Sequence, residues 1–361
     1  MNTHPFIEIG GRKIGLDYPC FVVAEMSGNH KQSFETAVEI LKAAKKAGAD
    51  AVKLQTYTPD TMTLDSRKEW FIVGAKTDDK TPDAWRGQAL YDLYKIAYTP
   101  WEWQPKLMEA AKEIGLMLFS SPFDATAVDF LEKMDVPCYK VASYEANDVP
   151  LLKKIASTGK PVILSIGFAS LEEVELSIDT LKKNGCKHIA VLHCVTGYTD
   201  VANPEEMNLR TITDIRERFG VVSGFSNNNG GIEIPLVSAT MGASIIEQHF
   251  TLRRADQAID STFSLEPQEL AEMIRRIRSV EQVLGKVHYG TLTPSDEEKK
   301  RFRRGLWVTK DMKKGEKFSS ENVRVLRPSV GLEPRFYEEV VEREANQDIQ
   351  AVTPLTRDLL A

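Results

Sequence analysis

The sequence predicts an α/β protein whose main domain is a closed (β/α)8 TIM barrel, and three observations predict this class. Eight short β-type runs alternate with eight helical patterns. The runs are apolar throughout, as parallel strands covered on both faces are. The eight units span roughly 250 residues, the usual size of such a barrel. An open doubly wound sheet is the alternative, but its glycine-rich turn is absent after the first strand.

The expected strands follow one another at the spacing of βα units. They are residues 20–25, 51–55, 116–121, 138–143, 161–167, 189–194, 221–226 and 244–250. Between the first two strands, Ser33 is the expected helix N-cap and Gly48 the expected stop. A hairpin, "FIEIGGRKIG", precedes the barrel. The connection at 56–100 is long and rich in Trp and Tyr, so we expect it to be functional or partly helical.

The composition changes after Gly285. We expect residues 1–285 to hold the hairpin and barrel, 286–304 to form a charged linker, and 305–361 to form a small second domain. That domain is punctuated by Gly and Pro, and its core must be thin.

Composition limits the classes of function. With 361 residues, 42% hydrophobic and 27% charged, the chain can form a sizeable core. A net charge of -6 gives no nucleic-acid or acidic-membrane signal. The four cysteines have neither metal nor disulfide spacing. No apolar run approaches ~18 residues and no signal peptide is visible, so we expect a soluble cytoplasmic protein with reduced thiols.

Polar residues stand at the C-terminal ends of the expected strands, where barrels of this class place their chemistry. They are Glu25, Asn29, His30, Lys53, Gln55, Ser120, Ser121, Lys140, Ser143, Glu145, Ser165, His193, Thr196, Tyr198, Ser226, Glu247, His249 and the asparagines of "GFSNNN". Two lysines and several serines on one rim predict a pocket for phosphate and carboxylate, although the serines could merely cap helices. Glu25 is a general acid/base candidate, or a simple partner of a lysine. His249 lies on the same strand face as Glu247. The sequence favours equally a metal ligand and a buried histidine of the core at this position.

Several segments resemble the sialic acid synthase family, most closely its pseudaminic acid synthase branch. They are "VAEMSGNH", "AVKLQTYTPDTMTL", "YTPWEW", "SSPFD", "YKVAS" and "HFTLRRADQAIDSTFSLEP". These enzymes condense phosphoenolpyruvate with an N-acetylated sugar, which in that branch is 2,4-diacetamido-2,4,6-trideoxy-L-altrose. The tail "RRGLWVTKDMKKGEKFSSENVRVLRP" is similar to the family's SAF (antifreeze-like) domain. The resemblance covers almost the whole chain.

The resemblance implies roles for matching positions. Glu25 matches the acidic residue beside the reacting carbons. The positions that match the phosphoenolpyruvate pocket are Lys53, Ser121, Lys140, Ser143, Ser165 and Ser226. Thr196 stands where the family commonly has Asn or Ser, and its hydroxyl could serve the same pocket. Those that match the sugar site are Gln55, Glu145, Tyr198, Asp260 and Arg327. Arg327 would enter the active site of a partner subunit, which implies a domain-swapped homodimer. His249 matches one of two histidines that hold a divalent metal, Mn²⁺ or Mg²⁺.

The sequence departs from the family at the seventh strand. The family motif is Gly-aromatic-Ser-Asp-His-Thr, and this chain has "GFSNNN", with Asn228 in place of the second metal-binding histidine. Asn offers a carbonyl oxygen to hard cations but binds transition metals more weakly than imidazole. The asparagines at 227 and 228 therefore leave three outcomes open. Asn228 and His249 could bind the divalent metal less tightly, the enzyme could act on a different sugar, or the chain could be a weakly active or inactive paralogue. In the C-terminal segment, "EREANQDIQAVTPL" lacks the family's usual glycines, which leaves its turn geometry open.

Three functions follow from these residues. The first is a pseudaminic-acid-type synthase. The second is a synthase for another acetamido sugar, such as N-acetylmannosamine (an N-acetylneuraminate synthase) or a legionaminic acid precursor. The third is a non-catalytic sugar-binding protein. The retained phosphoenolpyruvate-pocket residues argue against the third.

Overall fold

The computed structural model describes residues 4–74, 82 and 84–361. The chain divides into two compact units, Met1–Gly285 and Lys286–Ala361. Each unit is described by itself. Within the described ranges, no helix has both the length and the apolar character that crossing a bilayer requires.

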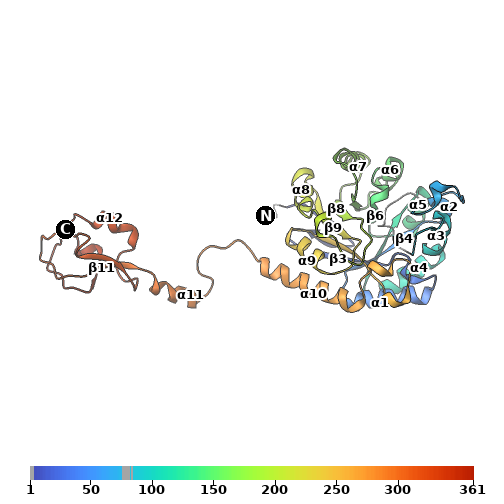
Figure 1. Ribbon diagram of the computed structural model, residues 1–361. Helices are drawn as coiled ribbons and strands as arrows, with labels where there is room; N and C mark the ends of the chain where they lie inside the picture. Colours follow the sequence, from blue (N-terminus) through green and yellow to red (C-terminus); the bar gives the residue numbers. More distant parts are fainter. Residues whose placement is uncertain (1–3, 75–81, 83) are drawn as a thin grey trace. The chain divides into compact units, whose positions relative to one another are not determined.

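The first unit is a closed barrel of eight parallel strands ringed by helices (Figure 1). The strands are β3 (Phe21–Glu25), β4 (Ala51–Thr56), β5 (Met117–Pro122), β6 (Tyr139–Val141), β7 (Val162–Ser165), β8 (Ile189–Val195), β9 (Val222–Asn227) and β10 (Ile245–His249). The barrel closes where β10 pairs with β3, with His249 opposite Glu25. This closure brings the first and last strand ends together, and the predicted TIM barrel is confirmed.

The helices after these strands lie where the periodicity predicts them. They are α1 (Phe34–Ala47), α4 (Gln104–Glu113), α5 (Ala125–Lys133), α6 (Val149–Ala156), α7 (Leu171–Lys183), α8 (Arg210–Phe219), α9 (Glu233–Thr240) and α10 (Pro267–Leu284). Helix α1 begins after Ser33, whose side chain accepts the Thr36 N–H, and it ends at Gly48, whose φ of 94° suits glycine. Both caps were predicted.

The long connection between β4 and α4 is partly helical, which is one of the two properties predicted for residues 56–100. It contains α2 (Pro59–Met62) and α3 (Leu90–Ala97). Residues 75–81 and 83 of this connection lie outside the described residues. The remainder folds over the C-terminal side of β4 and supplies side chains to the cavity described below.

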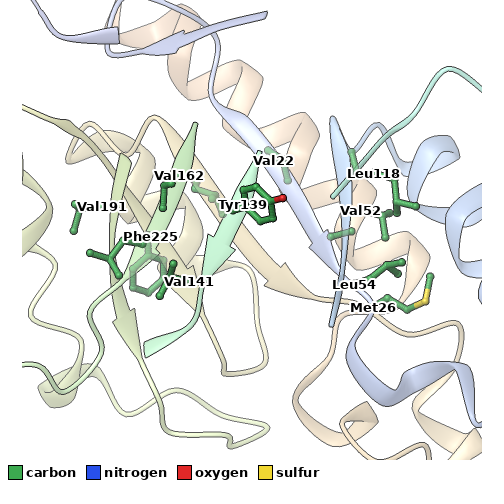
Figure 2. Close-up of a cluster of buried hydrophobic side chains, with 14 of the residues drawn as sticks. Val22, Met26, Val52, Leu54, Leu118, Tyr139, Val141, Val162, Val191 and Phe225 are labelled. Carbon is green, nitrogen blue, oxygen red and sulfur yellow. The ribbon is translucent and has the colours of Figure 1, made fainter. Parts of the chain in front are cut away.

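Two apolar layers hold the barrel together. Outward-facing strand residues such as Val22, Val52 and Val191 pack under the surrounding helices (Figure 2). Inward-facing residues near the strand starts, including Phe21 and Ile163, form a second cluster closed by the hairpin of β1 (Phe6–Ile9) and β2 (Arg12–Gly15). Because the N-terminal half of the barrel interior is filled, a ligand has room only at the C-terminal ends of the strands.

The second unit contains a three-stranded antiparallel sheet in the order β12-β11-β13. Its elements are α11 (Pro294–Lys299), β11 (Gly305–Val308), β12 (Val323–Leu326), α12 (Tyr337–Val340) and β13 (Thr353–Pro354). Leu306 and Phe318 are central to its small core. Glu342 and Val352 adopt φ of 74° and 64°, the left-handed region that favours glycine. The turns of the segment "EREANQDIQAV" are thus made without glycine.

Candidate active site

A cavity of about 930 Å³ opens at the C-terminal ends of the barrel strands. Its floor is polar because the strand residues that point inward change from apolar to polar at this end. On β10, Glu247 and His249 both line the cavity. Asn227 and Gln248, one residue out of phase, instead bond each other, with Nδ2 donating to Oε1 at 2.7 Å. The two-residue period of a strand therefore selects which polar side chains face a ligand.

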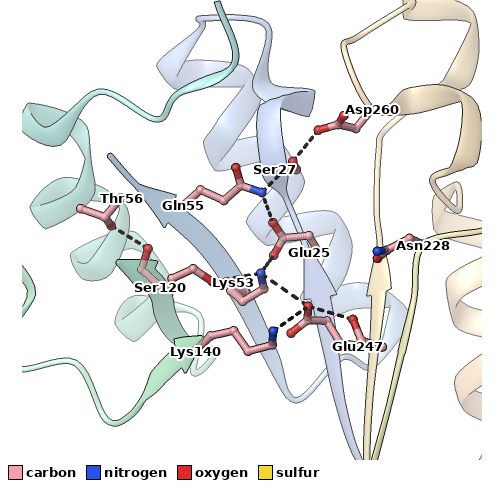
Figure 3. A network of polar contacts seen from close by, with 12 residues as sticks. Glu25, Ser27, Lys53, Gln55, Thr56, Ser120, Lys140, Asn228, Glu247 and Asp260 are labelled. Carbon is pink, nitrogen blue, oxygen red and sulfur yellow. Dashed lines mark hydrogen bonds and ion pairs between the residues drawn. The ribbon is translucent and has the colours of Figure 1, made fainter. Parts of the chain in front are cut away.

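A buried charge network occupies the floor (Figure 3). Lys53 Nζ lies 2.8 Å from Glu25 Oε2 and 3.5 Å from Glu247 Oε1. Lys140 Nζ lies 3.9 Å from Glu247 Oε1. None of the four residues is more than 5% exposed. Ser121 does not line the cavity. Its hydroxyl accepts a hydrogen bond from Lys53 Nζ at 3.2 Å, which helps to fix the position of that lysine.

The two cations and two carboxyls of the floor perturb one another. Burial raises the pKa of Glu25 to about 7, although the charge of Lys53 opposes that rise. Burial alone would lower the pKa of Lys53, but the charges of Glu247 and Glu25 raise it overall. Burial lowers the pKa of Lys140, and Glu247 only partly offsets this. When Glu25 takes a proton near neutral pH, Lys53 loses one of its two anionic partners and keeps Glu247.

A second network joins Glu25 to the rim. Gln55 Nε2 donates to Glu25 Oε1 and to Ser27 Oγ, both at 3.0 Å. Ser27 in turn donates to Asp260 through a short hydrogen bond. Ser27 adopts a left-handed φ of 48°, which turns its hydroxyl toward the cavity. Sequence reasoning missed Ser27, and its only signal there is its place two residues after Glu25.

Several buried polar atoms of cavity-lining residues have no hydrogen-bond partner among the described residues. Glu145 Oε2 and Ser165 Oγ are two of them. A buried polar atom without a partner is costly, so its presence beside a cavity favours a ligand that completes the bond. Burial also raises the pKa of Glu145 to about 7.

Replacement of Glu145 by glutamine is expected to flatten the pH dependence of stability. The pKa of Glu145 is raised in the folded protein from 4.5 to about 7, so the folded state holds the proton more tightly than the unfolded state. Its contribution is therefore fully present below pH 4.5 and lost as pH rises toward 7, by on the order of 3 kcal/mol. Urea unfolding of wild type and Glu145→Gln at pH 5 and pH 8 measures this. Glu172→Gln, at an exposed position, is the control, and parallel pH curves for wild type and Glu145→Gln would contradict the assignment.

Asn228 and His249 offer two potential metal ligands. Nδ1 of His249 is buried and has no hydrogen-bond partner in the described part of the chain. Burial, helped by Lys53, lowers the pKa of His249 to about 3, so its imidazole is neutral, as a ligand must be. Asn228 Nδ2 donates to Cys194 Sγ at 3.6 Å, which leaves its carbonyl oxygen available. No cluster of three or more His, Cys, Asp or Glu able to hold a metal occurs among the described residues.

The other two asparagines of "GFSNNN" hold the turn after β9. Asn227 Nδ2 donates to the Asn229 carbonyl at 2.9 Å, and Gln248 Nε2 donates to the same oxygen at 3.1 Å. Asn229 Oδ1 accepts from the Thr199 hydroxyl at 2.8 Å. Gly230 follows them where a Cβ would lie 2.1 Å from the Asp200 carbonyl, so only glycine fits. Asn227 and Asn229 are structural, and Asn228 alone faces the cavity.

Most of the predicted site residues meet at this one cavity. Those that line it are Glu25, Lys53, Gln55, Lys140, Ser143, Glu145, Ser165, Tyr198, Ser226, Asn228, His249 and Asp260. Ser121 and Thr196 are absent from the described lining, and Thr196 instead lies beside Gly167. Arg327 belongs to the second unit, where it is exposed and forms no ion pair with any described residue.

Four other candidates at the strand ends have structural partners instead. Asn29 Nδ2 donates to the Phe250 carbonyl and to Ser264. His30 contacts the Thr99 hydroxyl, Ser120 that of Thr56, and His193 the Met207 carbonyl. These bonds fix the loops around the cavity.

Another wall of the cavity is largely aromatic and apolar, and of the aromatic residues named here sequence reasoning assigned only Tyr198. Trp85 packs against Tyr198 with ring centroids 5.1 Å apart, and its Nε1 donates to the Ile259 carbonyl. Tyr94 stands edge-on to Tyr57 at 5.6 Å. Trp85 and Tyr94 come from the long connection, whose aromatic content was the one available signal.

Comparisons with known proteins agree with this architecture. A model of the NeuB family matches residues 40–289, and a model of the SAF domain matches residues 303–361. A pseudaminic acid synthase of Campylobacter jejuni is 41% identical over 336 residues, 92% of this chain and 94% of that protein. An N,N'-diacetyllegionaminic acid synthase of Legionella pneumophila is 31% identical over 348 residues, 94% of each chain.

A solved structure extends the likeness to three dimensions. The spore coat polysaccharide biosynthesis protein SpsE of Bacillus subtilis superposes with a TM-score of 0.66 at 32% identity, and the match covers 99% of both chains. The predicted SAF domain after the barrel is thereby confirmed.

Proposed function

The chain belongs to the NeuB family of nonulosonic acid synthases, as the resemblance predicted, and we propose that it is a synthase of the pseudaminic acid type. It would condense phosphoenolpyruvate with a diacetamido trideoxy hexose and release phosphate. The observation that carries the proposal is the pair of buried lysines, Lys53 and Lys140, facing the same cavity as Glu25. The 41% identity to a pseudaminic acid synthase, against 31% to a legionaminic acid synthase, favours the first sugar class.

The floor of the cavity suits phosphoenolpyruvate, which carries a phosphate and a carboxylate. Lys53 and Lys140 supply the two positive charges. The hydroxyls of Ser143, Ser165 and Ser226 line the same floor, and Ser165 Oγ has no partner among the described residues. In a site shielded from water these charge-assisted bonds are strong.

Glu25 is proposed as the acid/base of the reaction. Carbon C3 of phosphoenolpyruvate bonds to the aldehyde carbon of the open-chain sugar, the aldehyde oxygen takes the proton of the Glu25 carboxyl and becomes a hydroxyl, and positive charge develops at C2. Water adds to C2 and gives a proton to the Glu25 carboxylate. The C2 hydroxyl then becomes the ketone as the bond from C2 to the phosphate oxygen breaks, and its proton leaves with the phosphate. A pKa of about 7, raised by burial, suits a group that must accept and return a proton near neutrality. Gln55 and Ser27 hold the Glu25 carboxyl in position.

Asn228 and His249 would hold a divalent ion, Mg²⁺ or Mn²⁺. Such an ion supplies Lewis-acid polarisation of the sugar aldehyde oxygen. The neutral imidazole of His249 and the free carbonyl oxygen of Asn228 are this chain's contribution. Cys194 anchors the Asn228 amide and thereby orients that oxygen.

Replacement of Asn228 by histidine is expected to tighten Mn²⁺ binding roughly tenfold, because imidazole is the better ligand for a transition metal. Asn228→Ala should weaken it. Calorimetric titration with Mn²⁺ measures affinity without turnover. Mn²⁺ affinity and turnover that are both untouched by Asn228→His would place Asn228 away from the metal.

The decisive test of function is a coupled phosphate-release assay with a panel of acetamido sugars, with and without Mn²⁺. We expect release with 2,4-diacetamido-2,4,6-trideoxy-L-altrose above N-acetylmannosamine and a legionaminic acid precursor. Preference for another sugar would reassign the substrate. No release with any sugar at micromolar protein would sink the synthase proposal and leave a non-catalytic sugar-binding protein.

The second unit is proposed to complete the site in a homodimer. Arg327 is exposed and has no ion-pair partner among the described residues, so its charge is available to a substrate anion. The domain-swapped arrangement stays a prediction from the resemblance.

A further inference from the structure

One face of helix α3 turns toward the cavity. Leu90, Leu93, Tyr94 and Ala97 all line it, and they stand at positions i, i+3, i+4 and i+7 of the helix. That spacing forms a single stripe on an α-helix. The stripe carries three apolar side chains and one tyrosine ring, beside a floor that is otherwise charged and hydroxylic.

This stripe lies outside the main apolar clusters of the described residues. Leu93 is only 7% exposed, yet none of the four residues belongs to the hydrophobic clusters formed within the described ranges. Away from the stripe, α3 is fastened by polar contacts, with Tyr91 donating to Asp60 and Arg67 pairing with Asp92 at 2.9 Å. The helix therefore turns its polar side chains toward these partners and its apolar stripe toward the cavity.

The position of α3 relative to the reacting groups follows from Gly28. A Cβ at Gly28 would lie 3.2 Å from the Cα of Ala97, so the end of α3 sits against the backbone just beyond Glu25. The aldehyde carbon of the sugar must lie at the floor, near Glu25 and the lysines. With the aldehyde there, carbon C6 at the far end of the open chain lies away from the floor, among the cavity walls that include the stripe on α3.

We propose that the α3 stripe selects the group at sugar carbon C6, favouring a methyl group over a hydroxymethyl group. The inference rests on the proposed function and deepens it by naming specificity residues. A methyl group loses no hydrogen bond to water when it packs on Leu90 and Leu93, whereas a hydroxyl placed there loses one without replacement. A hydrophobic surface discriminates such a pair roughly tenfold or more.

The test measures binding without turnover. Two sugar alcohols serve as probes: the reduced forms of 2,4-diacetamido-2,4,6-trideoxy-L-altrose and of its 6-hydroxy counterpart. Neither has an aldehyde, so neither reacts. Calorimetry with the full chain should give roughly tenfold tighter binding of the 6-deoxy alcohol. Leu90→Asn, at a half-buried position, should bring the ratio close to one. Leu93→Asn should do the same if its thermal unfolding shows that it is folded.

Ile96→Asn is the matched control, because Ile96 lies on the same helix but is 47% exposed and does not line the cavity. It should keep the wild-type ratio. A wild-type ratio near one, a ratio unchanged by Leu90→Asn, or no binding of either alcohol would overturn the inference. If the ratio and its loss are found but the parent sugars release no phosphate, the synthase proposal fails and the assignment of α3 stands.

Discussion

Replacement of Lys53 by methionine is expected to abolish turnover and to destabilise the fold by about 3–5 kcal/mol at neutral pH. Lys53 is the cation between Glu25 and Glu247, at 2.8 and 3.5 Å, and all three are buried. Without it, two carboxyls face each other in a site shielded from water. The loss should shrink as pH falls, because protonated carboxyls no longer need the cation. Urea unfolding at several pH values and the phosphate-release assay measure both effects.

Two further variants separate charge balance from chemistry. Lys53→Met combined with Glu247→Gln removes one carboxylate along with the cation, and it should recover much of the stability but none of the turnover. Lys46→Met, at an exposed position on α1, should change stability by no more than about 0.5 kcal/mol. If Lys53→Met leaves phosphate release within a factor of ten of wild type, Lys53 does not bind phosphoenolpyruvate.

Glu25→Gln is expected to lower kcat by about 10²- to 10⁴-fold while the protein stays folded. Glutamine has nearly the shape of glutamate and can still bond Gln55, but it cannot accept a proton from the water that attacks C2. KM for phosphoenolpyruvate should change little, because Lys53 and Lys140 remain. The wild-type rate profile should show an ionisation near pH 7, where burial places the pKa of Glu25, and the variant profile should lack it.

The matched control for this loss is Glu35→Gln, which removes an exposed carboxylate from the first turn of α1 and should leave kcat unchanged. A Glu25→Gln protein whose kcat stays within tenfold of wild type, or whose profile keeps the ionisation near pH 7, would remove Glu25 from the acid/base role.

The barrel could be predicted because each strand is a short apolar run and each helix has its own boundary signals. Ser33 and Gly48 show this at single-residue level, since one caps α1 and the other ends it. The long connection was harder. Its aromatic content indicated a function, but α3 is only eight residues long, and its stripe of cavity residues depends on how it docks beside Gly28.

Site residues could be predicted where they lie on a strand, because the alternation of side chains along the strand then tells which ones face the barrel interior. Lys53, Lys140 and Glu247 come from strands, whose alternation places them inside the barrel. Thr196 lies beyond the end of β8, where alternation no longer applies, and it contacts Gly167 instead of the cavity. Ser27 depends on a left-handed backbone conformation that a serine rarely adopts, so no local pattern indicates it.

The three consecutive asparagines have different positions: two hold the turn after β9, and the middle one faces the cavity. Asn227 and Asn229 bind the turn through buried amide bonds, whereas the middle side chain, among described residues, bonds only a thiol. A substitution at 228 therefore removes none of the hydrogen bonds by which Asn227 and Asn229 hold the loop, so it can test the proposed metal role of Asn228 on an unchanged backbone.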